Sequence, residues 1–372
     1  MKNIEIIAFY LPQYHPFKEN DEWWGKGFTE WTNVGKAKPL FKGHNQPRVP
    51  TELGYYDLRL PIIREQQAQM AKDAGVTGFC YWHYWFGNGK RLIPEVFQEV
   101  LDSGTPDFPF CLGWANHSWY AKNWNANGTS TNKLLIEQTY PGLEDEKMHF
   151  DFLLKAFQDS RYIKIDGKPL LYIFDPISIS QEYIENFRKW TKLSGFPDIY
   201  LVANIASQTA TKEVLLEKGF DAVNYQRLGG LQNAALKRMG LWGSRIFALW
   251  RRIYGMIVRR PPFMYDYSRY YNELITDEEY KEDVIPSIMP QWDHTPRSGW
   301  NGTFWINATP NIFALHCKEA LCAVKNKKNK ILFLKSWNEW GEGNMMEPDM
   351  TYGRGFIDTL RKTVDDFDKY EK

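Results

Sequence analysis

Two glutamates separated by two residues, Glu339 and Glu342, are the strongest candidates for chemistry in this sequence. They lie in the segment 336–343, SWNEWGEG, where tryptophan and glycine residues interleave with the acids. Two carboxyl groups a few ångströms apart can cleave a glycosidic bond, because one donates a proton while the other attacks or accepts a proton. Tryptophan rings stack on sugar C–H faces, and glycine lets the backbone approach a ligand closely. Two acids at this spacing are more often solvated surface residues, but these neighbours favour a catalytic role.

The acid pair directly follows the apolar run 331–334, ILFL, which is typical of a strand buried on both faces. Similar runs recur along the chain and alternate with helical patterns. The expected strands are 4–10, 76–82, 108–114, 169–174, 199–203, 222–225, 284–291 and 331–334. The expected helices are 59–74, 92–101, 144–158, 181–193, 211–218, 267–274, 312–324 and 355–370.

Eight strand–helix units predict an α/β fold, a (β/α)8 TIM barrel, with its chemistry at the C-terminal ends of the strands. We expect one domain over 1–372, with long β–α loops and an insertion at 227–265. An open doubly wound sheet is the alternative fold. No GxGxxG or GxxxxGK[ST] motif indicates a nucleotide site.

Polar and aromatic residues cluster just past the expected strands, as a glycan site requires. Strand-end residues of a barrel face its site about half the time, so we expect roughly half of them to contact substrate. These strand-end candidates are Tyr10, Gln13, Tyr14, His83, Tyr84, Trp85, Trp114, Asn116, Asn204, Trp292 and Asp293. The other predicted substrate-binding residues are Trp24 and Glu30 in the first long loop and Trp337, Asn338 and Trp340 beside the acids. For Glu30, a role in bracing its loop is equally compatible with the sequence.

Composition narrows the classes of function further. The formal net charge of +1 gives no bulk attraction to nucleic acid, and 16% of the 372 residues are aromatic, which suits a glycan site. The four cysteines lack metal-ligand spacing, and Cys80 and Cys111 lie in apolar runs typical of buried thiols. The seven histidines form no HxH or HExxH motif, and GxSxG is absent. We therefore expect neither a metal nor a cofactor.

The N-terminal residues MKNIEIIAFYLPQY have the pattern of a first strand and not of a signal peptide. No apolar run reaches the length of a membrane span. We expect a cytoplasmic protein, with peripheral contact at the inner membrane as a further possibility.

That possibility comes from the stretch 224–265, which contains no acidic residue. Six apolar residues within it fall on about a third of a helix circumference: Trp242, Ile246, Leu249, Trp250, Ile253 and Ile257. Basic residues at 237–260 accompany them, and arginines recur every seven residues from 238 to 259. We expect 241–258 to be helical. The pattern is typical of an interfacial membrane helix, or of an inserted helix whose apolar face packs on the barrel.

Motifs along most of the chain resemble the WbsX-like proteins of bacterial surface-polysaccharide loci, which are related to glycoside hydrolase family 99. The matching stretches are AFYLPQYHP, WWGKGFTEW, GFCYWHYWFGNGKRL, PFCLGWAN, RYIKIDGKPL and SWNEWGEGNMMEP. The pattern WANENW, usual after the third strand, is replaced here by WANHSW, with His117 and Ser118.

The resemblance implies an enzyme that cleaves α-mannosidic bonds with retention and needs no metal or cofactor. Glu339 would be the base toward the sugar 2-hydroxyl, giving an anhydro-sugar intermediate, and Glu342 the acid/base. WbsX-like proteins are also described as glycosyltransferases, so a glycosyltransferase of O-antigen or lipopolysaccharide biosynthesis is the alternative. A binding barrel without activity is disfavoured by the intact acid pair. The expected partner is an oligo- or polysaccharide, lipid-linked in one variant of this hypothesis, and not nucleic acid.

Overall fold

The computed structural model describes residues 4–124, 130–206, 210–228 and 263–370. Between the last two ranges it also describes residues 240, 242–243, 245–246, 249–250, 253 and 257. Along these residues no helix is long and apolar enough to cross a membrane.

Eight parallel strands form a barrel and confirm the predicted fold class. In chain order they are β1 (Glu5–Tyr10), β2 (Gly78–His83), β3 (Phe110–Trp114), β7 (Lys168–Ile173), β8 (Tyr200–Ile205), β9 (Ala222–Tyr225), β11 (Ser287–Ile288) and β13 (Ile331–Leu334). Neighbours in the sheet follow the same order, and β13 pairs with both β11 and β1, so late and early parts of the chain meet. Backbone hydrogen bonds of Val223 with Asp283 and Ile285 connect β9 to the segment before β11. The two-residue strand β6 (Lys164–Ile165) pairs antiparallel with β7, off this path.

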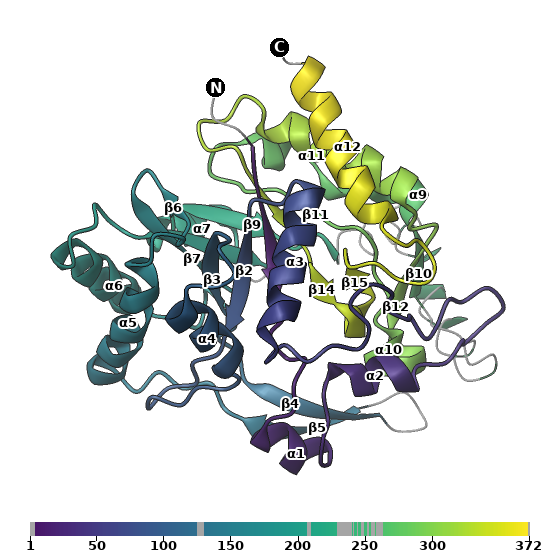
Figure 1. The fold of residues 1–372 in the computed structure, drawn as a ribbon, viewed down its shortest axis with the longest axis horizontal. Coiled ribbons are helices and arrows are strands. Elements are labelled where there is room, and N and C mark those ends of the chain that lie inside the picture. The colour runs from purple at the N-terminus through teal and green to yellow at the C-terminus, as the bar shows by residue number, and fades with distance from the viewer. Residues whose placement is uncertain are drawn as a thin grey trace.

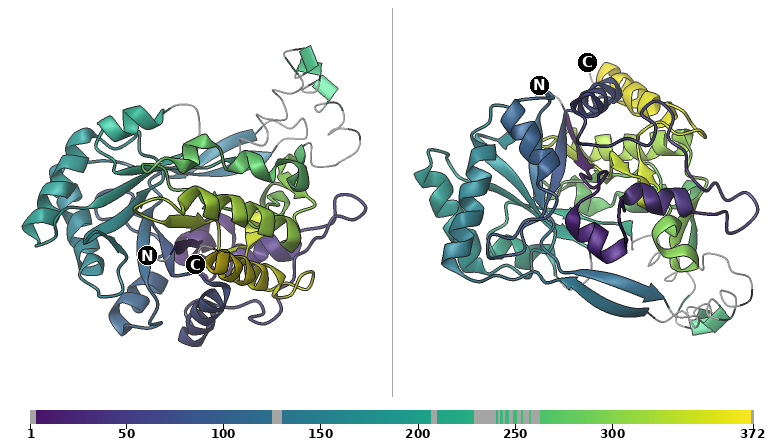
Figure 2. Two further views of the ribbon diagram at one scale, coloured as in Figure 1. Left: turned by 90° about the horizontal axis from the view of Figure 1, so that it is seen from above. Right: turned by 60° about the horizontal axis from the view of Figure 1, so that its bottom comes forward.

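Helices cover the outside of the barrel (Figure 2). They are α3 (Pro61–Ala74), α4 (Glu95–Ser103), α5 (Leu143–Phe157), α6 (Gln181–Leu193), α7 (Lys212–Glu217), α11 (Pro310–Val324) and α12 (Gly355–Tyr370). Local signals set their ends. Helix α11 begins with Pro310 after the side-chain cap of Thr309, and α3 ends at Gly75, whose φ of +84° favours glycine.

Most predicted bounds agree with these elements within a few residues. Two expectations were wrong in extent. Of the expected strand 284–291 only β11 pairs as a strand, and the expected helix 267–274 divides into α9 (Tyr267–Tyr270) and the 3₁₀ helix η1 (Tyr271–Leu274). Both apolar patterns are real, since Val284, Ile288 and Leu274 are buried, but burial does not require regular structure.

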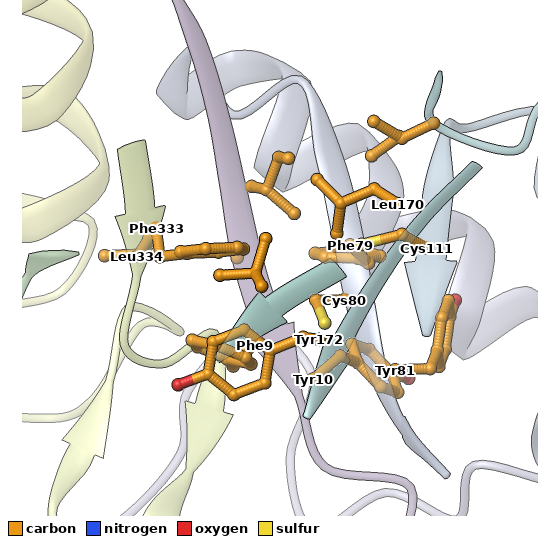
Figure 3. Close-up of a cluster of buried hydrophobic side chains, with 14 of the residues drawn as sticks. Phe9, Tyr10, Phe79, Cys80, Tyr81, Cys111, Leu170, Tyr172, Phe333 and Leu334 are labelled. Carbon is orange, nitrogen blue, oxygen red and sulfur yellow. The ribbon is translucent and has the colours of Figure 1, made fainter. Parts of the chain in front are cut away.

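Aromatic rings fill the barrel interior (Figure 3). The ring of Phe9 stacks on Trp82 at 4.9 Å and on Phe333 at 5.1 Å, and it meets Tyr172 edge-on at 4.9 Å. Aromatic pairs at these distances add stability beyond that of area burial, by roughly 0.5–1.5 kcal/mol each. Cys80 and Cys111 are buried free thiols, as predicted.

Further elements extend from the C-terminal strand ends. They are α1 (Lys18–Trp24), α2 (Glu30–Lys36), the hairpin of β4 (Trp119–Trp124) and β5 (Ser130–Ile136), the parallel pair β10 (Phe263–Asp266) and β12 (Thr303–Ile306), α10 (Thr295–Ser298), the hairpin of β14 (Asn338–Glu339) and β15 (Asn344–Met345), and the 3₁₀ helices η2 (Asp277–Tyr280), η3 (Gly299–Asn301) and η4 (Trp340–Glu342). Figure 1 shows α2, α10, β14 and β15 together at one end of the barrel. This is the face where the candidate residues were expected.

Within the predicted helix 241–258, residues 242–243, 245–246, 249–250, 253 and 257 are helical, and the others lie outside the described residues. The six apolar side chains of its predicted face are exposed. The described part of this face is therefore not packed against the barrel, which removes one of the two alternatives for it.

Candidate active site

The two glutamates lie on a short hairpin directly after β13. Glu339 ends β14, which pairs antiparallel with β15, and Glu342 lies in η4 between these two strands. Gly343 turns the chain with φ of +54°. At Gly341 a Cβ atom would overlap the Glu30 carboxylate and lie 2.9 Å from Arg297 Nε. Any side chain larger than glycine would therefore force the Glu30 carboxylate and the Arg297 guanidinium to shift.

Those groups form a cluster of three carboxylates around one guanidinium. Arg297 on α10 donates from Nη1 to Glu342 Oε1 at 2.7 Å and from Nη2 to Glu339 Oε2 at 3.2 Å. Its Nε donates to Glu30 Oε2 at 3.1 Å. Glu30 begins α2, so loops following β1, β11 and β13 each contribute. We call Glu30, Arg297, Glu339 and Glu342 the carboxylate cluster.

The cluster is mostly buried but reaches solvent. The exposed fractions of the side chains are 10% for Glu339, 18% for Glu342 and 24% for Arg297. Burial disfavours charge, whereas an adjacent cation favours an ionised carboxylate. The two glutamates of the pair differ in the balance of these effects.

Burial first, and then the negative charge of Glu342, raise the pKa of Glu339 to about 8. Burial also acts on Glu342, but the positive charges of Arg297, Lys335 and His294 outweigh it and lower the pKa of that carboxyl. These shifts favour the protonated form of Glu339 and the ionised form of Glu342. One neutral and one ionised carboxyl group is the division that acid–base catalysis requires.

Glu347, a buried carboxyl group outside the carboxylate cluster, supports the hairpin through hydrogen bonds. Glu347 accepts hydrogen bonds from Gln67 Nε2 at 2.6 Å, Tyr56 Oη at 2.8 Å and Trp340 Nε1 at 2.6 Å. Burial raises the pKa of Glu347 to about 7 despite these donors. Trp340 thus anchors η4 and is completely buried, so it offers no ring face to a sugar.

Other predicted binding residues beside the acids also brace this hairpin. The Asn338 side chain pairs with the backbone N–H and C=O of Leu11, and Tyr14 Oη donates to Asn338 O at 2.5 Å and accepts from Trp340 N at 3.0 Å. Trp337 has no exposed surface. The expectation of direct sugar contact is corrected for these residues, because none of them has exposed surface.

Asp293 and Trp292, expected beside the substrate, have a similar bracing position. The Asp293 carboxylate accepts from Gln46 Nε2 at 2.7 Å and from Thr295, and it pairs with His44 Nε2 at 2.9 Å. Its backbone N–H donates to Glu342 O at 2.7 Å. Both residues are less than a tenth exposed, and Trp292 stacks on His294.

The remaining strand-end candidates, His83, Trp85, Trp114, Asn116, Asn204 and Tyr10, are turned into the interior. His83 contacts His149, with 2.9 Å between their Nε2 atoms, and burial lowers its pKa to about 3. The indole N–H of Trp85 donates to the Asp145 carboxylate, and the indole N–H of Trp114 donates to the Trp85 carbonyl. Asn116 forms hydrogen bonds with Tyr140 and Asp175, and Asn204 forms them with Tyr172 and Phe174. Tyr10 Oη donates to Gln67. All six side chains are less than a tenth exposed.

Four other predicted binding residues lie closer to the carboxylate cluster or to solvent. They are Glu30, Gln13, Tyr84 and Trp24. Glu30 belongs to the carboxylate cluster. Gln13 Nε2 donates to Tyr84 Oη at 2.9 Å. Burial first, and then the negative charges of Glu339 and Glu30, raise the pKa of Tyr84, whereas the positive charge of Arg297 acts in the opposite direction. Trp24 is 45% exposed at the end of α1.

Sequence reasoning missed Arg297. It lies four residues beyond Asp293, in the segment after the seventh strand, where a lone arginine carries no motif of its own. The one available signal was its place in a loop at a strand end. Across the described ranges, no three His, Cys, Asp or Glu side chains are grouped so as to hold a metal ion.

Comparisons with known proteins agree with this fold. A structure of the GH99 endo-alpha-mannosidase from Bacteroides thetaiotaomicron superposes with a TM-score of 0.56 at 16% identity, over 99% of this chain and 98% of that chain. A structure described as a glycoside hydrolase-like protein has a TM-score of 0.56 at 17% identity, over 98% and 94% of the two chains. At these identities the likeness shows the barrel fold alone.

The sequence comparisons show the family. The uncharacterized protein WxcX of Xanthomonas campestris pv. campestris (strain B100) is 31% identical over an alignment of 369 positions, which covers 96% of this chain and 49% of WxcX. The chain therefore spans about half the length of the curated relatives it matches. A family model described as Glycosyltransferase WbsX matches residues 6–360. The chain belongs to this WbsX family.

Proposed function

We propose that this protein is a carbohydrate-active enzyme that cleaves an α-linked, mannoside-like glycan with retention, as part of surface-polysaccharide metabolism. The observation that carries the proposal is the meeting of Glu339 and Glu342 on one guanidinium at the C-terminal end of β13. The barrel shared with an endo-alpha-mannosidase and the membership of the WbsX family support the class of substrate.

We propose Glu339 as the proton donor and Glu342 as the base. Glu339 holds a proton at neutral pH, which it would give to the glycosidic oxygen as the bond breaks. Glu342 is ionised and would take the proton of the sugar 2-hydroxyl, whose oxygen then attacks the anomeric carbon. These roles are the reverse of those implied by the resemblance to family 99, and the reason is the position of Arg297 beside Glu342.

Arg297 occupies the space between the two carboxyl groups, where the reacting sugar carbon would have to lie. Substrate binding would therefore displace the guanidinium from Glu339, its longest contact at 3.2 Å, while its contact with Glu342 at 2.7 Å keeps that carboxyl group ionised. Glu30 remains a partner for Arg297 in the displaced position. We retain Gln13, Tyr84 and Trp24 as proposed sugar contacts around the cluster.

The experiment compares Glu339→Gln and Glu342→Gln on α-mannosides with poor and with activated aryl leaving groups. General acid catalysis contributes about 10²–10⁴-fold, so loss of the proton donor slows the poor substrate by that factor. An activated leaving group departs without protonation, and Glu339→Gln is expected to recover most of its rate on it. Glu342→Gln is expected to be slow on both. Recovery by Glu342→Gln alone would restore the roles implied by family 99.

A glycosyltransferase is the second candidate, favoured by the description of the family model. Arg297, Lys335 and His294 place three basic side chains near Glu342, and His294 Nε2 lies 3.9 Å from its carboxylate. Such a group could receive the diphosphate of a sugar nucleotide. Wild type that transfers sugar from a nucleotide donor, yet releases no reducing sugar from α-mannans or O-antigen fragments, would establish this candidate in place of the first.

A further inference from the structure

The described residues of the segment 242–257 expose an apolar helical face. The exposed fractions are 77% for Trp242, 66% for Ile246, 61% for Leu249, 49% for Trp250, 46% for Ile253 and 75% for Ile257. These spacings place the six side chains within about a third of the helix circumference. Helix α12 shows the usual alternative, because its apolar residues Phe356, Ile357 and Leu360 are buried against the protein. These six side chains therefore present to solvent the kind of apolar surface that α12 buries.

The position of the segment agrees with this exposure. In both views of Figure 2 the short helical pieces near residue 245 stand apart from the barrel. A contiguous exposed patch of large apolar side chains is rare on proteins without an interaction partner and marks an interaction site. The patch includes two tryptophans, residues that favour the boundary between apolar and polar media.

The charge around this face identifies the kind of partner. Between residues 224 and 265 the sequence has no Asp or Glu but carries eight Lys or Arg, among them Arg245 and Arg252. Arg245 lies 5.9 Å from the centre of the Trp242 ring, at the side of the apolar face. A second copy of this chain would bring the same positive charge to the contact and is disfavoured. An anionic lipid surface offers both an acyl region for the rings and headgroups for the arginines.

We propose that the exposed face of residues 242–257 docks the protein on an anionic lipid surface, with the helix lying in the plane of the headgroups. The apolar side chains enter the headgroup–acyl boundary and the basic side chains contact lipid phosphates. Each basic residue near an anionic surface raises binding by about fivefold at low salt. This inference is independent of the proposed reaction, since docking requires no sugar.

The test is sedimentation of the full chain with vesicles of phosphatidylcholine alone and with one-third phosphatidylglycerol. We expect binding to the anionic vesicles that falls at least tenfold in 0.5 M salt. The double variants Trp242→Ser with Ile246→Ser and Arg245→Glu with Arg252→Glu are each expected to lose at least tenfold. Leu143→Ser with Leu193→Ser is the matched control, because it removes two leucines that are 60% and 75% exposed on other helices. This control is expected to bind within about twofold of wild type.

Other results would overturn the proposal. They are the absence of binding to anionic vesicles, equal loss in the leucine control, or retention of binding by either double variant of the segment. A dimer in solution that the Trp242→Ser with Ile246→Ser variant abolishes would identify the face as a self-association surface. Thermal unfolding of each variant by circular dichroism checks that the fold is unchanged, as expected for exposed positions.

Discussion

Replacement of Glu339 by glutamine provides a sharp test of the charge state assigned to the carboxylate cluster. Glutamine has the shape of a protonated glutamate but does not titrate. A carboxyl group whose pKa rises from 4.5 to about 8 on folding binds its proton more tightly in the folded state. Its contribution to stability is complete below pH 4.5 and is lost as the pH rises through 8. The variant lacks this loss, so it gains stability relative to wild type as the pH rises.

The magnitude follows from one proton. Between pH 4.5 and pH 8 the free energy of unfolding of the variant, relative to wild type, increases by about 1.4 kcal/mol per pH unit. From pH 5 to pH 7 the gain is therefore about 3 kcal/mol. Over this range buried histidines such as His83 and His316 gain and lose protons only in the unfolded state, because burial lowers their pKa in the folded protein. Both proteins contain these histidines, so their effect cancels in the difference.

The assay is urea denaturation followed by tryptophan fluorescence at pH 5, 6, 7 and 8. Glu342→Gln is the comparison, because it removes the closest partner of Arg297 and leaves a largely buried cation with less compensation. At pH 5 we expect Glu342→Gln to be less stable than wild type by about 2–3 kcal/mol, near the lower end for a broken buried pair, whereas Glu339→Gln is close to wild type. The measured quantity is the free energy of unfolding of Glu339→Gln minus that of wild type. If it stays constant or decreases from pH 5 to pH 8, Glu339 is ionised in the folded protein and the assignment is refuted.

Three further substitutions test the support of the site. In urea denaturation at pH 7, Arg297→Gln is expected to lower the free energy of unfolding by about 2–4 kcal/mol. Arg297→Lys is expected to restore only part of this loss, because lysine lacks the guanidinium fork. Equal stability of wild type and Arg297→Gln would contradict a stabilising role of Arg297 in the carboxylate cluster. Gly341→Ala is expected to reduce kcat at least tenfold, since its Cβ would displace the Glu30 carboxylate. Gly35→Ala, a helical site with open space and no positive φ, is the control for folding by circular dichroism. Tyr14→Phe removes two hydrogen bonds to the hairpin and is expected to lower the free energy of unfolding by about 1–3 kcal/mol, measured by thermal unfolding. Unchanged stability would mean that these two hydrogen bonds do not stabilise the hairpin.

The barrel and its acid pair were predictable because their signals are local. Each strand is a short apolar run, and the rule that chemistry follows strand ends selects Glu339 and Glu342 directly. The hairpin of β4 and β5 was not predicted, because its two strands pair with each other outside the barrel and are not continuous apolar runs. Such pairing depends on a partner strand that a single segment does not reveal.

The direction in which each strand-end side chain points could not be predicted from the neighbouring sequence. Trp337 and Trp340 stand beside the acids in sequence, yet both are buried, while Trp24 in a distant loop is exposed. Whether an aromatic ring faces substrate or core depends on what other loops place above it. Arg297 shows the same dependence, because its significance lies in three carboxylates that are 42 to 267 residues away along the chain.

The pairing of β13 with β1 has a consequence for the biosynthesis of this protein. Asn338 holds the acid hairpin to Leu11, and these residues are 327 positions apart in the chain. A ribosome must therefore translate nearly all of the barrel before the carboxylate cluster can assemble, so a nascent chain carries no working acid pair. During that time β1 lacks the strand that later covers one of its edges, and closing so long a loop slows folding. An exposed apolar edge of this kind favours wrong pairing between chains. We therefore expect folding during synthesis to depend on how well this edge of β1 is protected until β13 has been made.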